Sequence, residues 1–516
     1  MLSQQVIARY ATMQNSFQSN TQALHLWDYD LILEKIGYGK TQWLLLIISG
    51  LLTITSVAAQ QSMSIIAITS QCEFGSSQAE KGLMMAACVA GLFFSTYIWG
   101  YISDDIGRRK VLLCGVFASN ILQFVLMFVT NIWIFNIINL FVGISIGGVS
   151  AAIYAYLSEF NTPKHRAVAI NYSTMFVSVT AIYVPVTAWM VLSSNWSLSL
   201  GDFVFRPWRL IMLISLLPGL MGGLLLLRYP ESPKLLLSQN KTNEAIQAVS
   251  WICKFNRGTP IQDLLNCDVF LLKSEVESDE NSIDNIPRCI LSKIARATAP
   301  LFHKPHGLYF IISNIAVFGM FFSSNGMQFW FPEIVNRSSE AFNDSSTVCE
   351  ILSEYNTKAE NFTLACSDHI SNKTYIDNII VGVAFLIGFS IQGTLINPLG
   401  RKNVLLAALI IATFSGICLH FFGNRTAVLV LFCLYILLPG LSISIMLGAI
   451  VDLVPTNLRG KAVSFCMSLG RLGIIAATNL MGFMLQPYCN ITFAICNFIL
   501  FVCVVLVNII PIQRST

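Results

Sequence analysis

The feature that most constrains this chain is a series of twelve apolar stretches, each long enough to cross a bilayer. A spanning helix needs about 20 mostly apolar residues, because the hydrocarbon core is about 30 Å thick and a helix rises about 1.5 Å per residue. We therefore predict an all-α membrane protein with twelve transmembrane helices. The stretches run approximately over 43–69, 82–102, 111–129, 133–157, 167–192, 208–228, 307–331, 377–396, 404–422, 427–450, 462–485 and 492–512.

Composition agrees with this prediction and excludes other classes of protein. Of the 516 residues, 55% are hydrophobic and only 11% are charged, whereas a soluble domain has roughly 25% charged residues. The near balance of 31 Lys+Arg against 27 Asp+Glu argues against binding to nucleic acid, which needs a clustered basic face. Since no metal-ligand spacing, nucleophile motif or phosphate-binding loop stands in a suitable context, we expect neither an enzyme nor a bound metal or cofactor.

Lys and Arg in the short loops predict which side of the membrane each loop faces. The loops after the second, fourth, eighth and tenth stretches carry nine such residues, and the short loops of the other face carry three, Lys81, Arg206 and Arg425. Basic loops stay in the cytoplasm, so both termini should be cytoplasmic, in a plasma membrane or a vesicle membrane. The polar first 42 residues contain no cleavable signal peptide, so the first span should act as an uncleaved signal.

The N-glycosylation sequons test this orientation independently, because glycosylation occurs in the lumen. Asn171 in the fifth span and Asn240 in a cytoplasmic loop should be out of reach. Seven sequons fall in predicted outside loops, at Asn195, Asn336, Asn343, Asn361, Asn372, Asn424 and Asn490.

The chain also repeats itself. Gly100 and Gly393 are 293 residues apart, and so are Arg108 and Arg401. Two six-helix halves related by duplication are typical of a rocking transporter with a site at the repeat interface near the membrane midplane. We therefore divide the chain into a cytoplasmic tail 1–42, a half 43–228, a cytoplasmic loop 229–306, a pseudo-symmetric half 307–512 with a glycosylated outside loop 332–376, and a tail 513–516.

The loop after the second span has a chemically specific order, Gly100-Tyr-Ile-Ser-Asp104-Asp-Ile-Gly107-Arg108-Arg-Lys110. Gly100 permits close helix approach, and Gly107 allows the turn. We expect the carboxylate of Asp104 to meet a basic group or a helix end where the two halves meet. An ordinary charged loop is the alternative, and the spacing and its echo after Gly393 argue against it.

This loop resembles the signature of the major facilitator superfamily, and the resemblance covers all twelve spans. Pro230-Glu-Ser-Pro-Lys234 resembles a segment shared by sugar porters, organic ion transporters and synaptic-vesicle-glycoprotein-like members, and Ile36-Gly-Tyr-Gly-Lys-Thr-Gln-Trp43 resembles the synaptic vesicle glycoprotein 2-related branch. The resemblance implies the major facilitator fold, with spans 1, 4, 7 and 10 around a central cavity. It also implies a cytoplasmic gate formed by Gly100, Asp104, Gly107, Arg108, Glu159, Arg166, Arg401, Asp452 and Arg459.

Polar residues on two of these spans are candidates for substrate binding, although amides in hydrocarbon equally often join helices. An offset of 264 aligns the candidates of the first and seventh spans one to one: Gln60, Gln61 and Ser64 with Ser324, Asn325 and Gln328. Sugar porters usually have a paired-Gln motif in the seventh span, and Ser323-Ser-Asn-Gly-Met-Gln328 there argues against hexose transport.

Arg471 is the only ionisable side chain that we place deep within a span, where a charge is costly and therefore suggests function. The alternative is a structural partner for a carbonyl or carboxylate. Proton symport usually needs a titratable group in the pathway, and no deep Asp or Glu occurs in any predicted span. This argues for facilitated diffusion, exchange or another coupling ion.

The leading hypothesis is a transporter of small organic solutes that works by alternating access, with Arg471 favouring a substrate that has an anionic group. The alternative is a transporter-like membrane protein without transport activity, in a regulatory or vesicle-trafficking role. We expect a monomer whose partners are the solute and the lipid bilayer. Four cysteines lie in outside loops, and since Cys349 and Cys366 share one loop, we expect a disulfide between them.

The orientation makes a direct prediction about glycosylation. Some of the seven outside sequons should have glycans, and Asn171 and Asn240 should have none. Glycosidase treatment followed by peptide mapping checks this, and a glycan on Asn240 would reverse the orientation.

Overall fold

The computed structural model describes residues 25–193, 196–200, 203–265, 270–272, 298–303, 306–338, 347–353, 368–455 and 458–511. Within these ranges twelve helices are long and apolar enough to cross a membrane, which confirms the predicted twelve-span fold. They are α3 (Lys40–Thr69), α5 (Gln78–Ile106), α6 (Arg108–Leu126), α7 (Ile132–Glu159), α8 (Pro163–Leu192), α9 (Pro207–Leu226), α14 (Gly307–Ser338), α16 (Asn372–Leu399), α17 (Arg401–Cys418), α18 (Arg425–Leu453), α19 (Arg459–Met484) and α20 (Cys489–Ile509).

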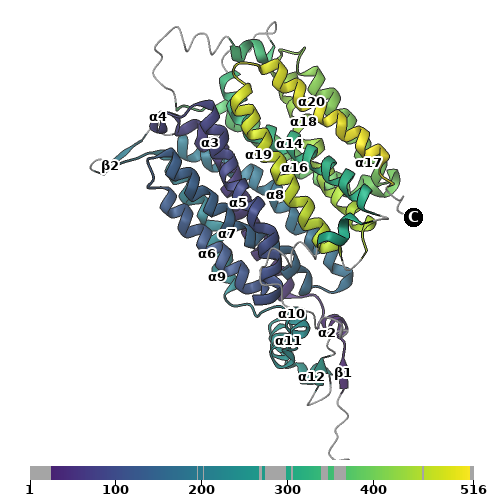
Figure 1. The fold of residues 1–516 in the computed structure, drawn as a ribbon. Helices are drawn as coiled ribbons and strands as arrows, with labels where there is room; N and C mark the ends of the chain where they lie inside the picture. Colours follow the sequence, from purple (N-terminus) through teal and green to yellow (C-terminus); the bar gives the residue numbers. More distant parts are fainter. Residues whose placement is uncertain are drawn as a thin grey trace, which may run out of the picture.

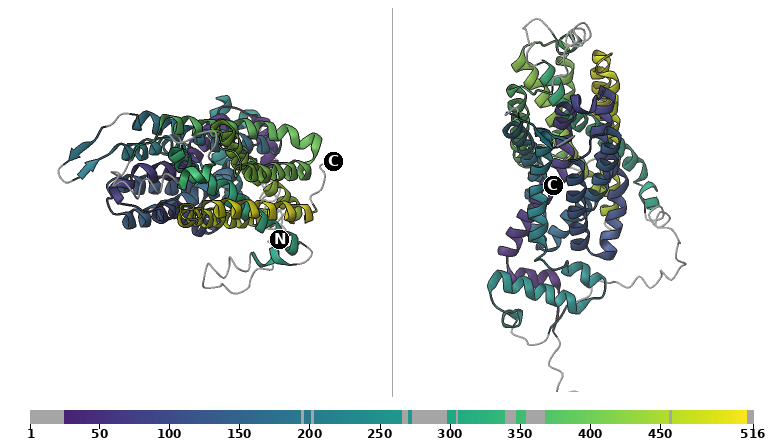
Figure 2. Two further views of the ribbon diagram at one scale, coloured as in Figure 1. Left: turned by 90° about the horizontal axis from the view of Figure 1, so that it is seen from above. Right: turned by 90° about the vertical axis from the view of Figure 1, so that its left-hand side faces the viewer.

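The twelve helices form two bundles that lie side by side, α3 to α9 in one and α14 to α20 in the other (Figure 1 and Figure 2, left). Two pairs of helices make most of the contact between the bundles: α19 lies along α5, and α16 lies along α8. The helices α3 and α14, which begin the two halves, also touch each other. The duplication in the sequence is therefore also a duplication in space.

One end of the bundle, which we call the inner end, bears a layer of short elements (Figure 2, right). The layer contains β1 (His25–Trp27), α2 (Tyr29–Ile36), α10 (Pro233–Ser238), α11 (Thr242–Arg257), α12 (Ile261–Leu265) and β4 (Phe270–Leu272), and β1 pairs with β4 in parallel. α11 forms because its buried residues, among them Ala245, Val249 and Ile252, recur at helical spacing on one face. A 3-10 turn, η1 (Ala299–Phe302), precedes α14.

The opposite end, the outer end, has α4 (Gln71–Phe74) and an antiparallel hairpin of β2 (Leu198–Leu200) and β3 (Phe203–Phe205). Three of the predicted glycosylation sites are exposed at the first residues of outer-end helices or beside them: Asn372, Asn424 and Asn490. The side chain of Asn336 instead binds the segment that leads into α16. It accepts a hydrogen bond from the backbone N–H of Ser371 at 2.9 Å and donates one to the carbonyl of His369 at 3.1 Å. Asn195, Asn343 and Asn361 lie outside the described residues.

Glycine makes the same turn in both halves. Gly107 separates α5 from α6 with φ +125°, and Gly400 separates α16 from α17 with φ +80°. L-residues rarely adopt positive φ, so glycine is needed at both positions, as the sequence predicts for Gly107. The expected close helix approach at Gly100 is not seen within the described part of the chain, where no atom of another element lies within 4 Å of a Cβ built there or at its repeat mate Gly393.

The predicted disulfide between Cys349 and Cys366 is wrong. Cys349 is bonded to Cys489 at the start of α20, with 5.6 Å between their Cα atoms. The reason is packing: residues 347–353 bury Val348, Ile351 and Leu352, which places Cys349 over the α19–α20 corner rather than toward its own loop. Cys366 lies outside the described residues, and Cys72 is also disulfide-bonded.

This pairing can be checked chemically. A peptide map of the non-reduced protein should contain a linked peptide with Cys349 and Cys489, and Cys489→Ser should expose Cys349 to a membrane-impermeant thiol reagent. Loss of a native disulfide typically costs about 2–5 kcal/mol, so Cys489→Ser should also lower the unfolding temperature. A linked peptide of Cys349 with any other cysteine would contradict the structure.

Candidate functional site

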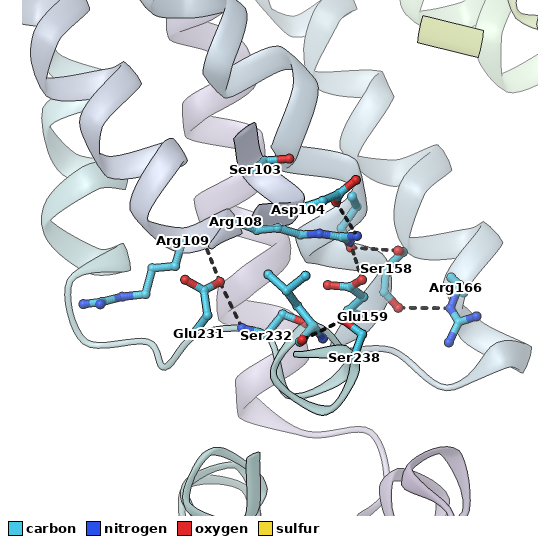
Figure 3. A network of polar contacts seen from close by, with 12 residues as sticks. Ser103, Asp104, Arg108, Arg109, Ser158, Glu159, Arg166, Glu231, Ser232 and Ser238 are labelled. Carbon is cyan, nitrogen blue, oxygen red and sulfur yellow. Dashed lines mark hydrogen bonds and ion pairs between the residues drawn. The ribbon is translucent and has the colours of Figure 1, made fainter. Parts of the chain in front are cut away.

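The inner end holds a network of polar contacts around Arg108, the first residue of α6 (Figure 3). The guanidinium of Arg108 forms an ion pair with Glu159, the last residue of α7, and a second one at 3.2 Å with Asp104. The side chain of Glu159 is 10% exposed and that of Asp104 is 66% exposed. Because screening by water weakens exposed pairs, the bond to Glu159 carries most of the stabilisation.

The carboxylate of Glu231 takes the place of a side-chain cap for α6. The residue at the N-cap of α6 is Gly107, which has no side chain. The Oε1 of Glu231 accepts from the backbone N–H of Arg109 at 2.8 Å, which is favourable at the positive end of a helix dipole. A Cβ built on Gly107 would lie 2.5 Å from the other carboxylate oxygen of Glu231, so this contact is a second reason for glycine.

The segment around Glu231 is held from both sides. Arg109 donates to the carbonyl of Leu227 at 2.7 Å, just after α9 ends, and the hydroxyl of Tyr156 donates to the carbonyl of Pro230 at 2.5 Å. The Pro230–Lys234 segment therefore ties α6, α7 and α9 together within the first half. Sequence analysis quoted this segment only as a resemblance and did not include Glu231 among the site residues.

The short layer at the inner end docks on the same network. Tyr29 of α2 donates to the carbonyl of Glu159 at 2.7 Å, and Arg166 forms an ion pair with Asp30 at 3.3 Å. Asn256 of α11 accepts from the backbone N–H of Thr41 at 2.8 Å.

The segment Ile36–Trp43 is the joint that holds α11 against the start of α3. A Cβ at Gly39 would lie 2.7 Å from the side chain of Asn256, so only glycine allows this contact. Tyr229 donates to the carbonyl of Thr41 at 2.9 Å, and burial raises the pKa of Tyr229, which keeps it protonated as a donor.

The second half has a reduced copy of this network. Arg401 pairs with Asp452, the repeat mates of Arg108 and Glu159, but these side chains are 35% and 53% exposed. Arg459 is exposed and donates to the carbonyl of Val454 at a long 3.5 Å. Among the described residues, no ion pair of a predicted gate residue joins the two halves. Asp104 pairs with a basic group, but this group is Arg108, four residues away in the same half; a contact of Asp104 where the halves meet stays a prediction.

A buried ion pair joins the two halves at the outer end. Lys81 of α5 and Glu333 of α14 are 2.8 Å apart, and they are 1% and 3% exposed. Neither residue was predicted from the sequence. Lys81 was counted as a loop residue, and the predicted seventh span ends at 331, before Glu333. One signal was present: Ser77 and Glu80 form a capping box, which places the start of the helix before Lys81.

Other contacts close the same end. Asp368, which precedes α16, accepts from the backbone N–H of Cys72 at 2.9 Å and pairs with Arg206 at 3.1 Å. Burial raises the pKa of Asp368, against these favourable contacts. A Cβ on Gly82 of α5 would lie 2.7 Å from a carbonyl of α19, and one on Gly382 of α16 would lie 2.7 Å from a carbonyl of α8. The halves therefore pack backbone to backbone at the outer end.

Arg471 lies near the middle of α19 and bonds to the opposite half. Its guanidinium donates to the hydroxyl of Thr96 on α5, to the carbonyl of Leu92 at 3.5 Å and to the hydroxyl of Ser150 on α7 at 3.3 Å. The side chain is buried, at 8% exposure. Among the residues that the structure describes, no carboxylate pairs with it.

The six polar candidates on α3 and α14 divide into two groups. Gln60, Ser64 and Ser324 donate to backbone carbonyls in their own half, at 2.6–2.9 Å. The side chains of the other three are partly exposed and make no hydrogen bond to a described residue: Gln61, Asn325 and Gln328. Gln61 and Asn325 are repeat mates, so the free amides occupy equivalent positions on the two central helices.

The inner network predicts unequal effects for two changes at Arg108 and its partners. Arg108→Met should destabilise the protein by about 3 kcal/mol, because it leaves the buried carboxylate of Glu159 without its cation. Asp104→Asn should cost less than about 0.5 kcal/mol, since it removes an exposed i,i+4 pair. Thermal unfolding of the purified variants in detergent checks this, and equal shifts would contradict the ranking.

Comparisons with known proteins agree with this architecture. The family model of the Major Facilitator Superfamily matches residues 46–348. Synaptic vesicle glycoprotein 2A of Rattus norvegicus is 26% identical over 219 residues, which are 42% of this chain and 30% of that protein. Synaptic vesicle glycoprotein 2B of Homo sapiens is 24% identical over 336 residues, 60% of this chain and 47% of that protein. The chain thus spans less than half the length of these relatives.

Solved structures show the same fold at low identity. A partially occluded inward-open conformation of the xylose transporter XylE from E. coli matches with a TM-score of 0.66 and 14% identity, over 92% of this chain and 99% of that one. An inward-open conformation of the same transporter matches with a TM-score of 0.63, over 92% and 97%. Together with the family match, the twelve helices and the repeated loops, this makes the chain a member of the Major Facilitator Superfamily, in the branch related to synaptic vesicle glycoprotein 2.

Proposed function

We propose that this protein transports a small organic solute across its membrane by alternating access, and that the structure is the inward-facing state. One observation carries the proposal: the halves are joined at the outer end by the buried Lys81–Glu333 pair, while the ion pairs of the inner end stay within each half. A rocking transporter in its inward-facing state has this distribution of contacts.

Two glycines at the inner end are suited to a close helix contact in the outward-facing state. The repeat mates Gly100 and Gly393 lie near the inner ends of α5 and α16, and no described atom of another element lies within 4 Å of a Cβ built on either. When the inner end closes, a facing helix can approach these glycines as closely as α19 approaches Gly82 at the outer end. The motif glycines are thus positioned for a contact of the outward-facing state.

The substrate we propose is a small organic solute with an anionic group. Gln61, Asn325 and Gln328 offer free amides on α3 and α14 for hydrogen bonds to its neutral part. Arg471 is charged at every physiological pH and is surrounded by hydroxyls and a carbonyl rather than by a described carboxylate. A carboxylate on the substrate supplies the missing negative charge, which is most valuable in a low-dielectric site.

A second function has one observation in its favour. Arg471 is 8% exposed and its hydrogen bonds to Thr96 and Ser150 join the two halves. Such contacts are equally suited to holding the halves together permanently, in a protein that does not change conformation. In that case the chain is a regulatory or vesicle-trafficking membrane protein with a transporter fold. The two functions differ in whether the hydrogen bonds of Arg471 to the opposite half break and form again.

The orientation is part of the proposal. We infer that the inner end, with the α2 and α10–α12 layer, faces the cytoplasm of a vesicle or plasma membrane, and that both termini are cytoplasmic. The nine Lys and Arg residues in the loops of that end support this, as does the exposure of Asn372, Asn424 and Asn490 at the other end.

An uptake assay with reconstituted vesicles tests the proposed function. Organic anions, cations and neutral metabolites are screened first, and we expect uptake of an anion. Arg471→Lys keeps the charge but loses the forked donor, so it should lower transport about ten- to hundredfold, nearly as much as Arg471→Ala. Arg228→Ala is the control, because this exposed arginine makes no ion pair with a described residue and belongs neither to the predicted gate nor to the binding candidates. Normal anion transport by both Arg471 variants would reject the anionic substrate.

A further inference from the structure

The Lys81–Glu333 pair is not explained by the loop motifs or by the substrate hypothesis. The two charged atoms lie 2.8 Å apart, on α5 of the first half and α14 of the second, and both side chains are almost completely buried. Removing charges from water is costly, so such a pair adds little to stability when it is intact, but separating its members is very unfavourable unless new partners appear. The pair therefore opposes opening of the outer end.

The charges around Glu333 are divided unequally between the halves. Arg337 lies one turn further along α14 and pairs with Glu333 at 2.6 Å, so this second cation moves with the carboxylate. The other described hydrogen bond of Lys81 goes to Gln71, a neutral amide of its own half, at 2.7 Å. When the halves separate at the outer end, Glu333 keeps a cation, whereas Lys81 loses its described anion.

Neighbouring acidic groups are already engaged and do not replace Glu333. Glu73 of α4 pairs with the buried Arg209 and lies 3.5 Å from Arg206. Asp368 pairs with Arg206 at 3.1 Å and lies in the segment that leads into α16 of the second half. Neither of these described carboxylates is therefore available to Lys81 in the open state, which leaves an anion from the solution as its partner.

We propose that the Lys81–Glu333 pair is the lock of the outer gate, and that its opening leaves Lys81 as the cation that receives an anion entering from the outer side. The proposal rests on the proposed alternating access, because a protein that never opens outward never frees Lys81. It adds a second cation to the anion pathway: the anion first replaces Glu333 at Lys81 and then reaches Arg471 near the midplane. Carboxylates and sulfonates are the ligands that this site favours.

The lock is tested by cysteine accessibility, which needs no knowledge of the substrate. Asn325→Cys places a reporter on α14, and a membrane-impermeant thiol reagent is added from the outer side. In the otherwise native protein labelling should be slow, because the outer end is closed. Lys81→Met and Glu333→Gln each break the lock and should increase the labelling rate about tenfold or more, as a population shift toward the outward-facing state.

Two controls separate a lock from a general loosening. Arg425→Met removes another ion pair of the outer end, with Asp377 at 2.8 Å, but this partly buried pair joins α18 to α16 within one half, so labelling should stay slow. The exchanged variant Lys81→Glu/Glu333→Lys is made together with Arg337→Gln, because Arg337 would otherwise lie beside the new cation. It restores opposite charges across the gate and should restore slow labelling. Each variant is compared with the same protein without Asn325→Cys, to subtract the native cysteines, and only protein at the cell surface is counted.

The anion-receiving role is tested by the charge of the reagent. The charge preference is the rate at which a sulfonate reagent labels Asn325→Cys, divided by the rate with a quaternary ammonium reagent. This ratio should be about threefold or more higher in Glu333→Gln, which frees Lys81, than in Lys81→Met. In the exchanged variant the preference should reverse toward the cationic reagent. When that gate opens, the group at position 81 that loses its partner is a carboxylate.

The outcomes that overturn the proposal are distinct. Equal labelling of Lys81→Met, Glu333→Gln and the Arg425→Met control would mean that the pair is not a lock. Equal charge preference in Glu333→Gln and Lys81→Met would mean that Lys81 does not receive the anion. If the labelling rates are as predicted but the native protein takes up no organic anion, the result would count against the proposed substrate and not against the lock.

Discussion

The bilayer core offers no water to an unpaired charge, and this constraint decides where the structure places its charged groups. Several of them form ion pairs at the helix ends, among them Arg108 with Glu159 at the inner end, and Lys81 with Glu333 at the outer end. Only pairs of the second kind cross between the halves, so they determine which end is closed. Arg471 is the exception among the described spans, a charge near the middle of a helix that is held by hydroxyls of the opposite half.

The fold itself was predictable because it depends on local properties of the chain. Twelve stretches of sufficient length and apolarity gave twelve helices, and the constant spacing from Gly100 to Gly393 gave the two halves. The helices extend several residues beyond the apolar stretches, since polar capping residues such as Ser77 begin a helix that a hydrophobicity criterion starts later. The turn glycine Gly107 was predictable for the same local reason, its positive φ.

The site was only partly predictable, because its contacts depend on which distant segments meet. Arg471 was recognisable as a charge in hydrocarbon, but its partners Thr96 and Ser150 come from two other helices. Glu333 lies just past an apolar stretch and nothing in its neighbourhood reveals that it faces Lys81, 252 residues away. Cys349 illustrates the same limit: closeness in sequence favoured Cys366, while the packing of residues 347–353 brought it to Cys489.

The central claim is that the two halves rock between a state closed at the outer end and a state closed at the inner end. Distances between spin labels on α5 and α19 in lipid nanodiscs test it most directly, with one pair at the outer ends (Ser77 and Gln486) and one pair at the inner ends (Asp105 and Lys461). We predict two populations, one with a short outer and a long inner distance and one with the reverse, whose ratio changes when the Lys81–Glu333 pair is removed. A single population at both ends, unchanged without that pair, would contradict alternating access and favour the non-transporting role.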